Sequence, residues 1–330
     1  MNDSTRRLAI PAEWSPQKAL WTAWPSHAEL WQEDLPGARR EVAAMVRALG
    51  EDQAVKVLAC GSEAIATASR ALEDVAEIVP ADFGDVWLRD TGPIFALDGG
   101  EPVALRFRNN GWGGKYILPG DDGVGDLVVS AAGVPARHFD FILEGGALEH
   151  NGEGLVLTTR QCLLNPNRNP GWDEAAATAH LKEALNCRQV LWLEEGLRND
   201  HTDGHVDNLA RFIAPGTVVC QKASGADDPN AVVYERIAGE LEAMGLTVIQ
   251  VPSPGRVPDE DDQPMPASHM NFIIGNATVV VPVYNAANGE AAVAALRELF
   301  PGRNVVGLAS RHLLTGGGSF HCITQQEPRA

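Results

Sequence analysis

A strand–helix–strand pattern recurs along this chain and limits the folds open to it more than any other feature. Three short apolar segments, 154–159, 216–221 and 277–283, begin about 62 and 61 residues apart. Each is followed by a polar loop, a helical pattern and a second apolar segment. The predicted helices are 173–185, 229–244 and 289–300, and the second apolar segments are 189–193, 247–252 and 304–309. Strands that alternate with helices are typical of an α/β fold.

The same order occurs twice more, nearer the N-terminus. The first upstream copy has strands at 19–24 and 54–60 with a helix at 34–49, and the second has strands at 102–108 and 137–142 with a helix at 121–132. Five similar modules favour a closed ring around an axis over the alternative, a single doubly wound sheet, because their spacing is nearly constant.

The chain shows no linker between the modules, although its length alone would allow two domains. The Pro-rich, acidic segment 252–266 reads as a mobile insertion within one module. We therefore expect residues 1–330 to form a single domain.

The composition excludes several classes of partner. The 44 acidic residues outnumber the 26 Lys and Arg residues, which gives a formal net charge of −18. Binding to nucleic acid or to anionic lipid requires a basic surface, so we expect neither partner. The charge suits a small cationic substrate, and it also suits plain solubility.

The five cysteines indicate a reducing compartment. They form no C-x-x-C pair and are odd in number, which favours free thiols over disulfides or a zinc ribbon. No stretch approaches 18 uninterrupted apolar residues, so we expect no membrane span. These features predict a cytoplasmic protein.

Each module ends in a short segment that carries glycine or reactive side chains. These segments are W-L-R-D-T-G-P (87–93), E-G-G-A-L (144–148), D-G-H-V-D-N (203–208), H-M-N (269–271) and G-G-G-S-F-H-C-I-T-Q-Q (316–326). If the modules are related by rotation, the five segments point at one axis. We therefore expect them to meet in one pocket.

The side chains in these segments suit attack on a cationic carbon that carries several nitrogens. A thiolate such as that of Cys322 is a nucleophile, and His205 can donate and accept a proton near neutral pH. Asp90, Glu144 and Asp207 supply carboxylates, which pair well with a planar guanidinium group.

Several residues also have a purely structural interpretation. Cys60, Cys162, Cys187 and Cys220 read as small core or structural residues. His201, His205 and Asp207 have the spacing of metal ligands, but Gly204 disfavours a rigid helix face there, and we expect no metal. Trp87 and Trp112 are either core aromatics or platforms on which a guanidinium stacks.

Six ordered motifs resemble the agmatine deiminase family, which is related to the bacterial peptidylarginine deiminases. They are W-L-R-D-T-G-P (87–93), N-G-W-G-G (110–114), E-G-G (144–146), L-L-N-P-N-R-N-P (163–170), T-D-G-H-V-D-N (202–208) and G-G-G-S-F-H-C-I-T-Q-Q-E-P (316–328). The resemblance runs from about residue 11 to the C-terminus. It implies the pentein fold, a five-bladed pseudo-symmetric α/β propeller of ββαβ-like modules.

The resemblance also implies roles for single residues. Cys322 resembles the nucleophile that forms an amidino-enzyme, and His205 the general acid and base. Asp90 and Asp207 resemble the pair that holds the guanidinium, and Glu144 matches a further acid of the pocket. The implied reaction converts agmatine into N-carbamoylputrescine and ammonia, in putrescine biosynthesis. It needs no metal or organic cofactor, and a homodimer is compatible with it.

Two departures from the family pattern leave the substrate open. His201 stands where many agmatine deiminases carry an acid, with Asp200 beside it as a candidate for substrate binding. The segment K-Y-I-L-P-G-D-D (115–122) replaces a longer one. Free or peptidyl arginine is therefore an alternative substrate. An amidinotransferase and a non-catalytic protein that binds a cationic ligand are alternative functions.

Overall fold

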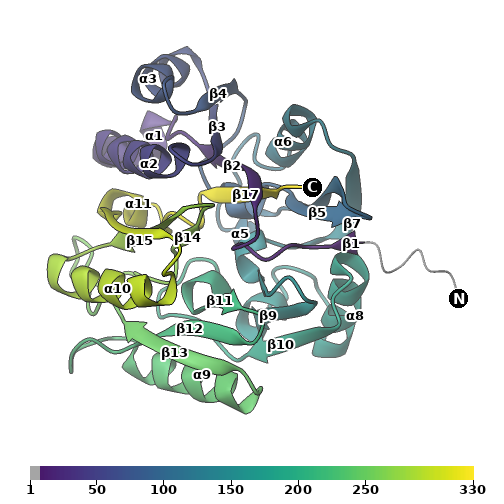
Figure 1. The fold of residues 1–330 in the computed structure, drawn as a ribbon, viewed down its shortest axis with the longest axis vertical. Helices are drawn as coiled ribbons and strands as arrows, with labels where there is room; N and C mark the ends of the chain where they lie inside the picture. The colour runs from purple at the N-terminus through teal and green to yellow at the C-terminus, as the bar shows by residue number, and fades with distance from the viewer. Residues whose placement is uncertain (1–7) are drawn as a thin grey trace, which may run out of the picture.

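The described residues fold into five separate β-sheets. The computed structural model describes residues 8–330, so residues 1–7 of the predicted 1–330 domain lie outside the described part. Because the strands divide among five sheets, a single doubly wound sheet is excluded for these residues. The long helices lie toward the outside of the molecule, and β17 (Thr324–Pro328) lies near its middle (Figure 1).

One pattern of strand pairing recurs in all five sheets. A middle strand pairs antiparallel with one neighbour and parallel with another. The triplets, each with its middle strand second, are β17, β2 (Gln17–Ala23), β3 (Ala54–Ala59); β5 (Ile94–Asp98), β6 (Glu101–Arg108), β7 (Ala136–Ile142); β8 (Glu149–His150), β9 (Leu155–Thr159), β10 (Gln189–Leu193); β11 (Ala210–Ala214), β12 (Thr217–Lys222), β13 (Thr247–Pro252); and β14 (Ile273–Ile274), β15 (Thr278–Val283), β16 (Asn304–Ala309). Two edge strands, β1 (Leu8–Ala9) on β5 and β4 (Glu77–Pro80) on β3, complete the sheets.

A long helix connects each middle strand to its parallel partner, which is the connection that parallel strands require. These helices are α2 (Leu35–Gly50), α6 (Val124–Ala132), α8 (Glu174–Leu185), α9 (Ala231–Ala243) and α10 (Ala286–Leu299). Side-chain caps start two of them: the Asp173 carboxylate accepts from the backbone N–H of Ala176 at 2.8 Å, and Asn285 accepts from that of Asn288 at 3.1 Å. The predicted helices and strands are thus confirmed, with ends that differ by a few residues.

The remaining helices are short or were not expected. They are α1 (Ala28–Trp31), α3 (Ser62–Leu72), α4 (Leu88–Thr91), α5 (Gly111–Gly114), α7 (Arg160–Leu163) and α11 (Arg311–Thr315), with single 3₁₀ turns at η2 (Gln32–Asp34), η3 (Gly145–Ala147) and η4 (Val206–Asn208). The sequence analysis predicted no element over α3. That helix buries Ala64, Ala68 and Leu72, and such small side chains produce a weak hydrophobic period.

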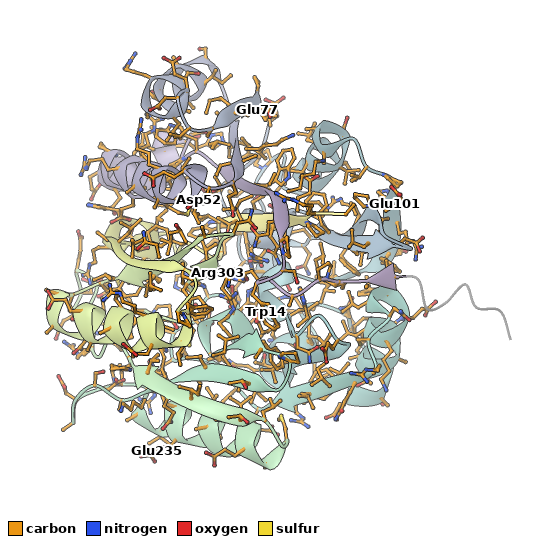
Figure 2. The ribbon with its side chains drawn as sticks, in the orientation of Figure 1. Trp14, Asp52, Glu77, Glu101, Glu235 and Arg303 are labelled. Carbon is orange, nitrogen blue, oxygen red and sulfur yellow. The ribbon has the colours of Figure 1, made fainter. Side chains whose placement is uncertain are left out.

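Hydrophobic side chains are buried between the helices and the sheets, and much of the negative charge lies outside. Val42 and Met45 of α2 and Val57 of β3, for example, belong to one buried cluster. The exposed carboxylates of Glu77 and Glu235 lie at the outer edge of the molecule (Figure 2). Among residues 8–330, no helix combines the length and the hydrophobicity needed to cross a bilayer.

The acidic segment 252–266 packs onto the structure at several points. Pro258 and Pro264 form an isolated bridge, and the side chain of Val257 is buried. Arg311 of α11 donates to the backbone carbonyl of Pro258. The segment follows β13, the last strand of one sheet, and precedes β14, the first strand of the next, so it connects two modules and is not an insertion within one.

Candidate active site

Three of the glycine-bearing segments meet around Gly146 in η3. A methyl group added to Gly146 would lie 2.6 Å from His205 Nδ1, 2.9 Å from Asp90 Oδ1 and 3.1 Å from Asp207 Oδ2. Asp90 belongs to α4, Asp207 belongs to η4, and His205 immediately precedes η4. Residues that are more than 100 positions apart in the chain are thus within van der Waals distance of one glycine.

The last two segments bring the Cys322 thiol to the same place. The side-chain amide of Asn271 donates to Cys322 Sγ at 3.1 Å, and its oxygen accepts from the Cys322 backbone N–H at 3.1 Å. Asp207 Oδ2 lies 3.7 Å from Sγ. Burial raises the pKa of the Cys322 thiol, and Asp207 and Asp90 raise it further. The free site therefore favours the thiol over the thiolate.

The His205 ring is fully buried beside two carboxylates. Its Nδ1 lies 3.7 Å from Asp90 Oδ1, and its Nε2 lies 4.0 Å from Glu144 Oε2. Neither nitrogen has a hydrogen-bond partner among the described residues. Burial lowers the pKa of His205, but Asp90, Cys162 and Glu144 outweigh burial and hold it well above the ordinary value. The ring is therefore charged near neutral pH and has free N–H groups to offer.

The two aspartates have different surroundings. Asp90 Oδ1 accepts from the Gly146 N–H and Asp90 Oδ2 from Trp112 Nε1, both at 2.8 Å, and burial raises the pKa of this carboxyl. Asp207 Oδ2 lies 2.8 Å from His321 Nδ1. Burial alone would raise the pKa of Asp207, but His321 and His205 outweigh it and lower the pKa below its ordinary value. Asp207 is therefore the more readily ionised of the pair.

Glu144 is held by an arginine that the sequence analysis did not single out. Arg168 Nε donates to Glu144 Oε1 at 2.7 Å, and both side chains are fully buried. Arg168 also bridges to Asp203 at 2.6 Å, which ties it to the loop before His205. The second oxygen of Glu144 has no partner among the described residues and lies nearest the His205 ring.

One group of described side chains has the arrangement of metal ligands. Glu144, Cys162 and His205 each offer one ligand atom, and these atoms lie within 4.8 Å of one another. The Arg168 guanidinium beside Glu144 opposes a second cation there, because like charges repel strongly in a buried site. The contact of Cys162 with His205 was not foreseen.

The site opens into a pocket of about 190 Å³. Trp87, Trp112 and Tyr116 contribute aromatic rings to its wall, and Asp90 and Cys322 also line it. Tyr116 is 44% exposed and Cys322 only 5%, so the pocket extends from an exposed aromatic rim to the buried thiol.

The glycine run after α11 lets Trp87 approach Cys322. A methyl group on Gly316 would lie 2.8 Å from the Trp87 ring, and one on Gly318 would lie 2.7 Å from that ring and 3.1 Å from Cys322 Sγ. The Trp87 indole N–H donates to Asp85 at 2.8 Å, which fixes the ring.

The structure brings every predicted site residue except Asp200 into the pocket or its immediate surroundings. Asp200 Oδ1 accepts from the hydroxyl of Thr202 at 2.6 Å, and Asp200 does not line the pocket. Its neighbour His201 does line it, with its ring stacked on Tyr116 at a centroid distance of 6.0 Å. Asn271, His321 and Arg168 were missed as individual side chains, although each lies in a quoted segment or motif.

Known proteins resemble the chain over nearly its full length. The Porphyromonas-type peptidyl-arginine deiminase family matches residues 9–328. The agmatine deiminase of Stutzerimonas stutzeri is 34% identical, over 97% of this chain and 95% of the relative. A substrate-bound agmatine deiminase from C. jejuni superposes with a TM-score of 0.91 and 30% identity, covering 97% of this chain and 96% of that one. The Enterococcus faecalis agmatine deiminase has a TM-score of 0.91 and 29% identity, with 99% and 97% covered.

Proposed function

The chain belongs to the Porphyromonas-type peptidyl-arginine deiminase family, and from this premise we propose that it hydrolyses agmatine to N-carbamoylputrescine and ammonia. The observation that carries the proposal is the convergence of His205, Asp90 and Asp207 on Gly146, with the Cys322 thiol 3.7 Å from Asp207. A thiol, a charged imidazole and two carboxylates are what the deimination of a guanidinium group requires.

Binding places the guanidinium plane between the two aspartates. Asp90 and Asp207 each accept hydrogen bonds from its N–H groups, and these charge-assisted bonds hold the central carbon in front of Cys322 Sγ. Trp87 and Trp112 line the pocket and supply faces on which the cation stacks.

The charge of the substrate activates the nucleophile. In the free site, burial, Asp207 and Asp90 raise the pKa of the Cys322 thiol. A bound guanidinium cation neutralises the two carboxylates and favours the thiolate. The site therefore becomes nucleophilic when its substrate is present.

The reaction then proceeds in two halves around one covalent adduct. The Cys322 thiol gives its proton to water, and Sγ bonds to the guanidinium carbon. The C–N bond to one terminal nitrogen breaks as His205 gives that nitrogen a proton. Ammonia leaves, and a thiouronium remains on Cys322. A water molecule gives a proton to His205, and its oxygen bonds to the carbon. The C–S bond then breaks with its electron pair on Sγ, the hydroxyl proton of the adduct passes to that thiolate, and the ureido product leaves.

The recurring strand pairing supports a finer reading of the fold. We propose that the five sheets are the blades of one pseudo-symmetric pentein propeller of ββαβ modules, and that residues 1–330 form a single catalytic domain. The site would then lie on the axis, where segments from all five modules can meet. The segment that follows α11 contributes Cys322 to the site, and α4 contributes Asp90.

The pocket supports agmatine over arginine as the substrate. The α-carboxylate of arginine would call for a free cation near the rim. Lys115 reaches the backbone carbonyl of the rim residue His201 at 2.8 Å, but it is also bonded to Asp203 at 2.6 Å, and the described residues that line the pocket include no lysine or arginine. An amidinotransferase would need a second amine beside the adduct, and a simple cation-binding protein would need no thiol or charged imidazole at this point.

We further propose that the enzyme acts in the cytoplasm, in putrescine formation, as a homodimer that requires neither nucleic acid nor a cofactor. The net charge of −18 supports a cationic small-molecule substrate. Light scattering of the purified protein tests the dimer.

The decisive experiment compares three substrates. The protein is incubated with agmatine, free arginine and an arginine peptide, and ammonia, ureido product and the Cys322 adduct are measured, the adduct by mass spectrometry. We expect ureido product from agmatine. Cys322→Ser should abolish turnover, whereas Cys60→Ser should retain it, because Cys60 is only partly buried and does not line the pocket. Product that appears only when an amine is added would favour transfer, and near-normal turnover by Cys322→Ser would exclude the mechanism.

A further inference from the structure

A buried chain of charged groups lies behind the pocket, and His321 is its middle member. The ring Nδ1 of His321 lies 2.8 Å from Asp207 Oδ2, and its Nε2 lies 3.1 Å from Glu13 Oε2. The three residues are buried, with exposures of 1% for His321, 0% for Asp207 and 6% for Glu13. Glu13 comes from the N-terminal segment, 308 positions away in the chain.

Glu13 is ionised in this setting. Its Oε1 accepts from the Ile274 backbone N–H at 2.7 Å, and its Oε2 also meets the Arg211 guanidinium. Burial alone would raise the pKa of Glu13, but Arg211 and His321 outweigh burial and hold the pKa well below its ordinary value. Each side of the His321 ring therefore faces a carboxylate rather than a carboxylic acid.

Two carboxylates fix the protonation of the ring between them. A neutral imidazole carries one N–H donor and one lone pair, so a neutral His321 would aim its lone pair at the oxygens of Asp207 or of Glu13. Only the doubly protonated ring donates on both sides. One short contact at each ring nitrogen, with a carboxylate group on either side, favours the imidazolium.

We propose that His321 is a positioning residue whose imidazolium, held by Glu13, keeps Asp207 ionised and turned toward Cys322 before substrate arrives. The proposal rests on the proposed function only in giving Asp207 the task of binding a guanidinium. His321 itself does not line the pocket and touches no reacting atom.

The position of the His321 charge explains its effect on the pocket. The 2.8 Å and 3.7 Å contacts of Asp207 Oδ2 place His321 Nδ1 within about 6.5 Å of Cys322 Sγ. Without that cation, Asp207 would sit beside Asp90 in a buried site with much less to favour its charged form.

The charged and titratable groups around this chain come from several elements. On the pocket side, Asp207 lies near Cys322, His205 and Asp90. On the other side, His321 and Glu13 border a small cavity whose further titratable or charged residues are Arg89, Glu149 and His150. Arg211 forms ion pairs with Glu13 and Glu149. His150 provides a control, because burial and Arg89 lower its pKa to about 4 and the ring is neutral.

The first test reads the His321 ring directly. In ¹⁵N-histidine-labelled enzyme without substrate, we expect both ring nitrogens of His321 to carry protons at neutral pH, with the signals assigned by their loss in His321→Asn. Glu13→Gln should remove one of the two N–H signals, since the second carboxylate is gone. His150→Asn should leave both in place. A neutral His321 ring in the wild-type enzyme at neutral pH would overturn the proposal, and so would two unchanged N–H signals in Glu13→Gln.

The second test reads the consequence for Asp207. Agmatine affinity is measured by calorimetry against pH in Cys322→Ser and in the same variant with His321→Asn. In the variant that also carries His321→Asn, we expect the pH at which affinity is lost on the acid side to rise by about one to two units, because a unit charge at hydrogen-bond distance from Asp207 has been removed. Glu13→Gln should shift it in the same direction.

A purely structural role gives a different pattern. If His321 merely fills space, His321→Asn lowers affinity equally at every pH, and that result would refute the proposal. If agmatine does not bind to Cys322→Ser and is not turned over by the wild type, the proposed function fails, while the labelled ring nitrogens still decide the state of His321.

Discussion

Adding one methyl group at Gly146 tests whether the arrangement around η3 is the catalytic centre. Gly146 is not among the residues with positive φ, so its backbone accepts alanine without strain. The new Cβ would lie 2.6 Å from His205 Nδ1, 2.9 Å from Asp90 Oδ1 and 3.1 Å from Asp207 Oδ2. The substitution Gly146→Ala therefore acts on three groups of the proposed site at once and removes none of them.

The size of the effect follows from these distances. Unstrained contacts to carbon lie near 3.5 Å, so the His205 ring must retreat by about 0.8 to 1 Å. A misplacement of about 1 Å costs roughly 100-fold in rate, which corresponds to about 3 kcal/mol of transition-state stabilisation. Overpacking a buried site costs about 1–3 kcal/mol of folding stability, so the protein should still fold.

Steady-state kinetics with agmatine and urea unfolding measure the two effects separately. We expect kcat/KM to fall about 100-fold in Gly146→Ala, while the free energy of unfolding falls by about 1–3 kcal/mol. Gly216→Ala is the matched control, because a methyl group there meets nothing within 4 Å, and it should leave kcat/KM unchanged. If Gly146→Ala kept kcat/KM within threefold of the wild type, the assignment of these groups as the reaction centre would be wrong.

Three further outcomes follow from the same structure. Because the pKa values of both Cys322 and His205 are raised, the pH–rate profile of kcat/KM should peak on the alkaline side of neutral pH. Asp90→Asn removes a charge that raises both pKa values, so it should move the optimum toward neutral pH. Burial raises the pKa of Asp121 to about 6, so the folded state binds this proton more tightly than the unfolded chain does. The stability of the wild type relative to Asp121→Asn should therefore fall by about 2 kcal/mol as pH rises from about 4 to about 7, measured by urea unfolding at both pH values. Besides Asp90, the acid that lines the pocket is Asp85, and its carboxylate is already bonded to two indole N–H groups. We therefore expect kcat/KM for agmatine to exceed kcat/KM for butylguanidine, which lacks the ammonium group, by less than tenfold. A larger ratio would show that an acid holds the ammonium tail.

The sequence could predict the regular elements and the principal site residues because both leave local signals. The repeat places β9, β12 and β15 at even intervals, and the strands and helices of the structure follow that order. Cys322 and His205 stand in short motifs whose residue types already suggest chemistry. Small side chains leave weaker signals, which is why α3 was missed.

Contacts between individual distant side chains had a weaker signal. The repeat predicted that the segments of Asn271 and Cys322 meet, but not that these two side chains pair. Glu13 meets His321 across 308 positions and lies outside the five segments, so no period or spacing links that pair. The position of Asp200 beside His201 suggested a place in the pocket, but the Asp200 carboxylate bonds to the local Thr202 hydroxyl instead, as aspartates in turns often do.

The same contacts make Asp90 and Asp207 unequal partners, although the sequence presents them as a matched pair. Asp90 is bonded to neutral donors, the Gly146 N–H and the Trp112 indole, and its pKa is raised. Asp207 is bonded to His321, and its pKa is lowered. Two neighbouring carboxylates in a buried site repel each other, so fixing the charge on one of them makes the other easier to neutralise. Asp207 is therefore the more readily ionised partner and provides the standing negative charge that attracts a guanidinium cation, whereas burial opposes the charge on Asp90 until that cation arrives. Because both aspartates raise the pKa of the Cys322 thiol, a cation that neutralises them favours the thiolate when a substrate is bound.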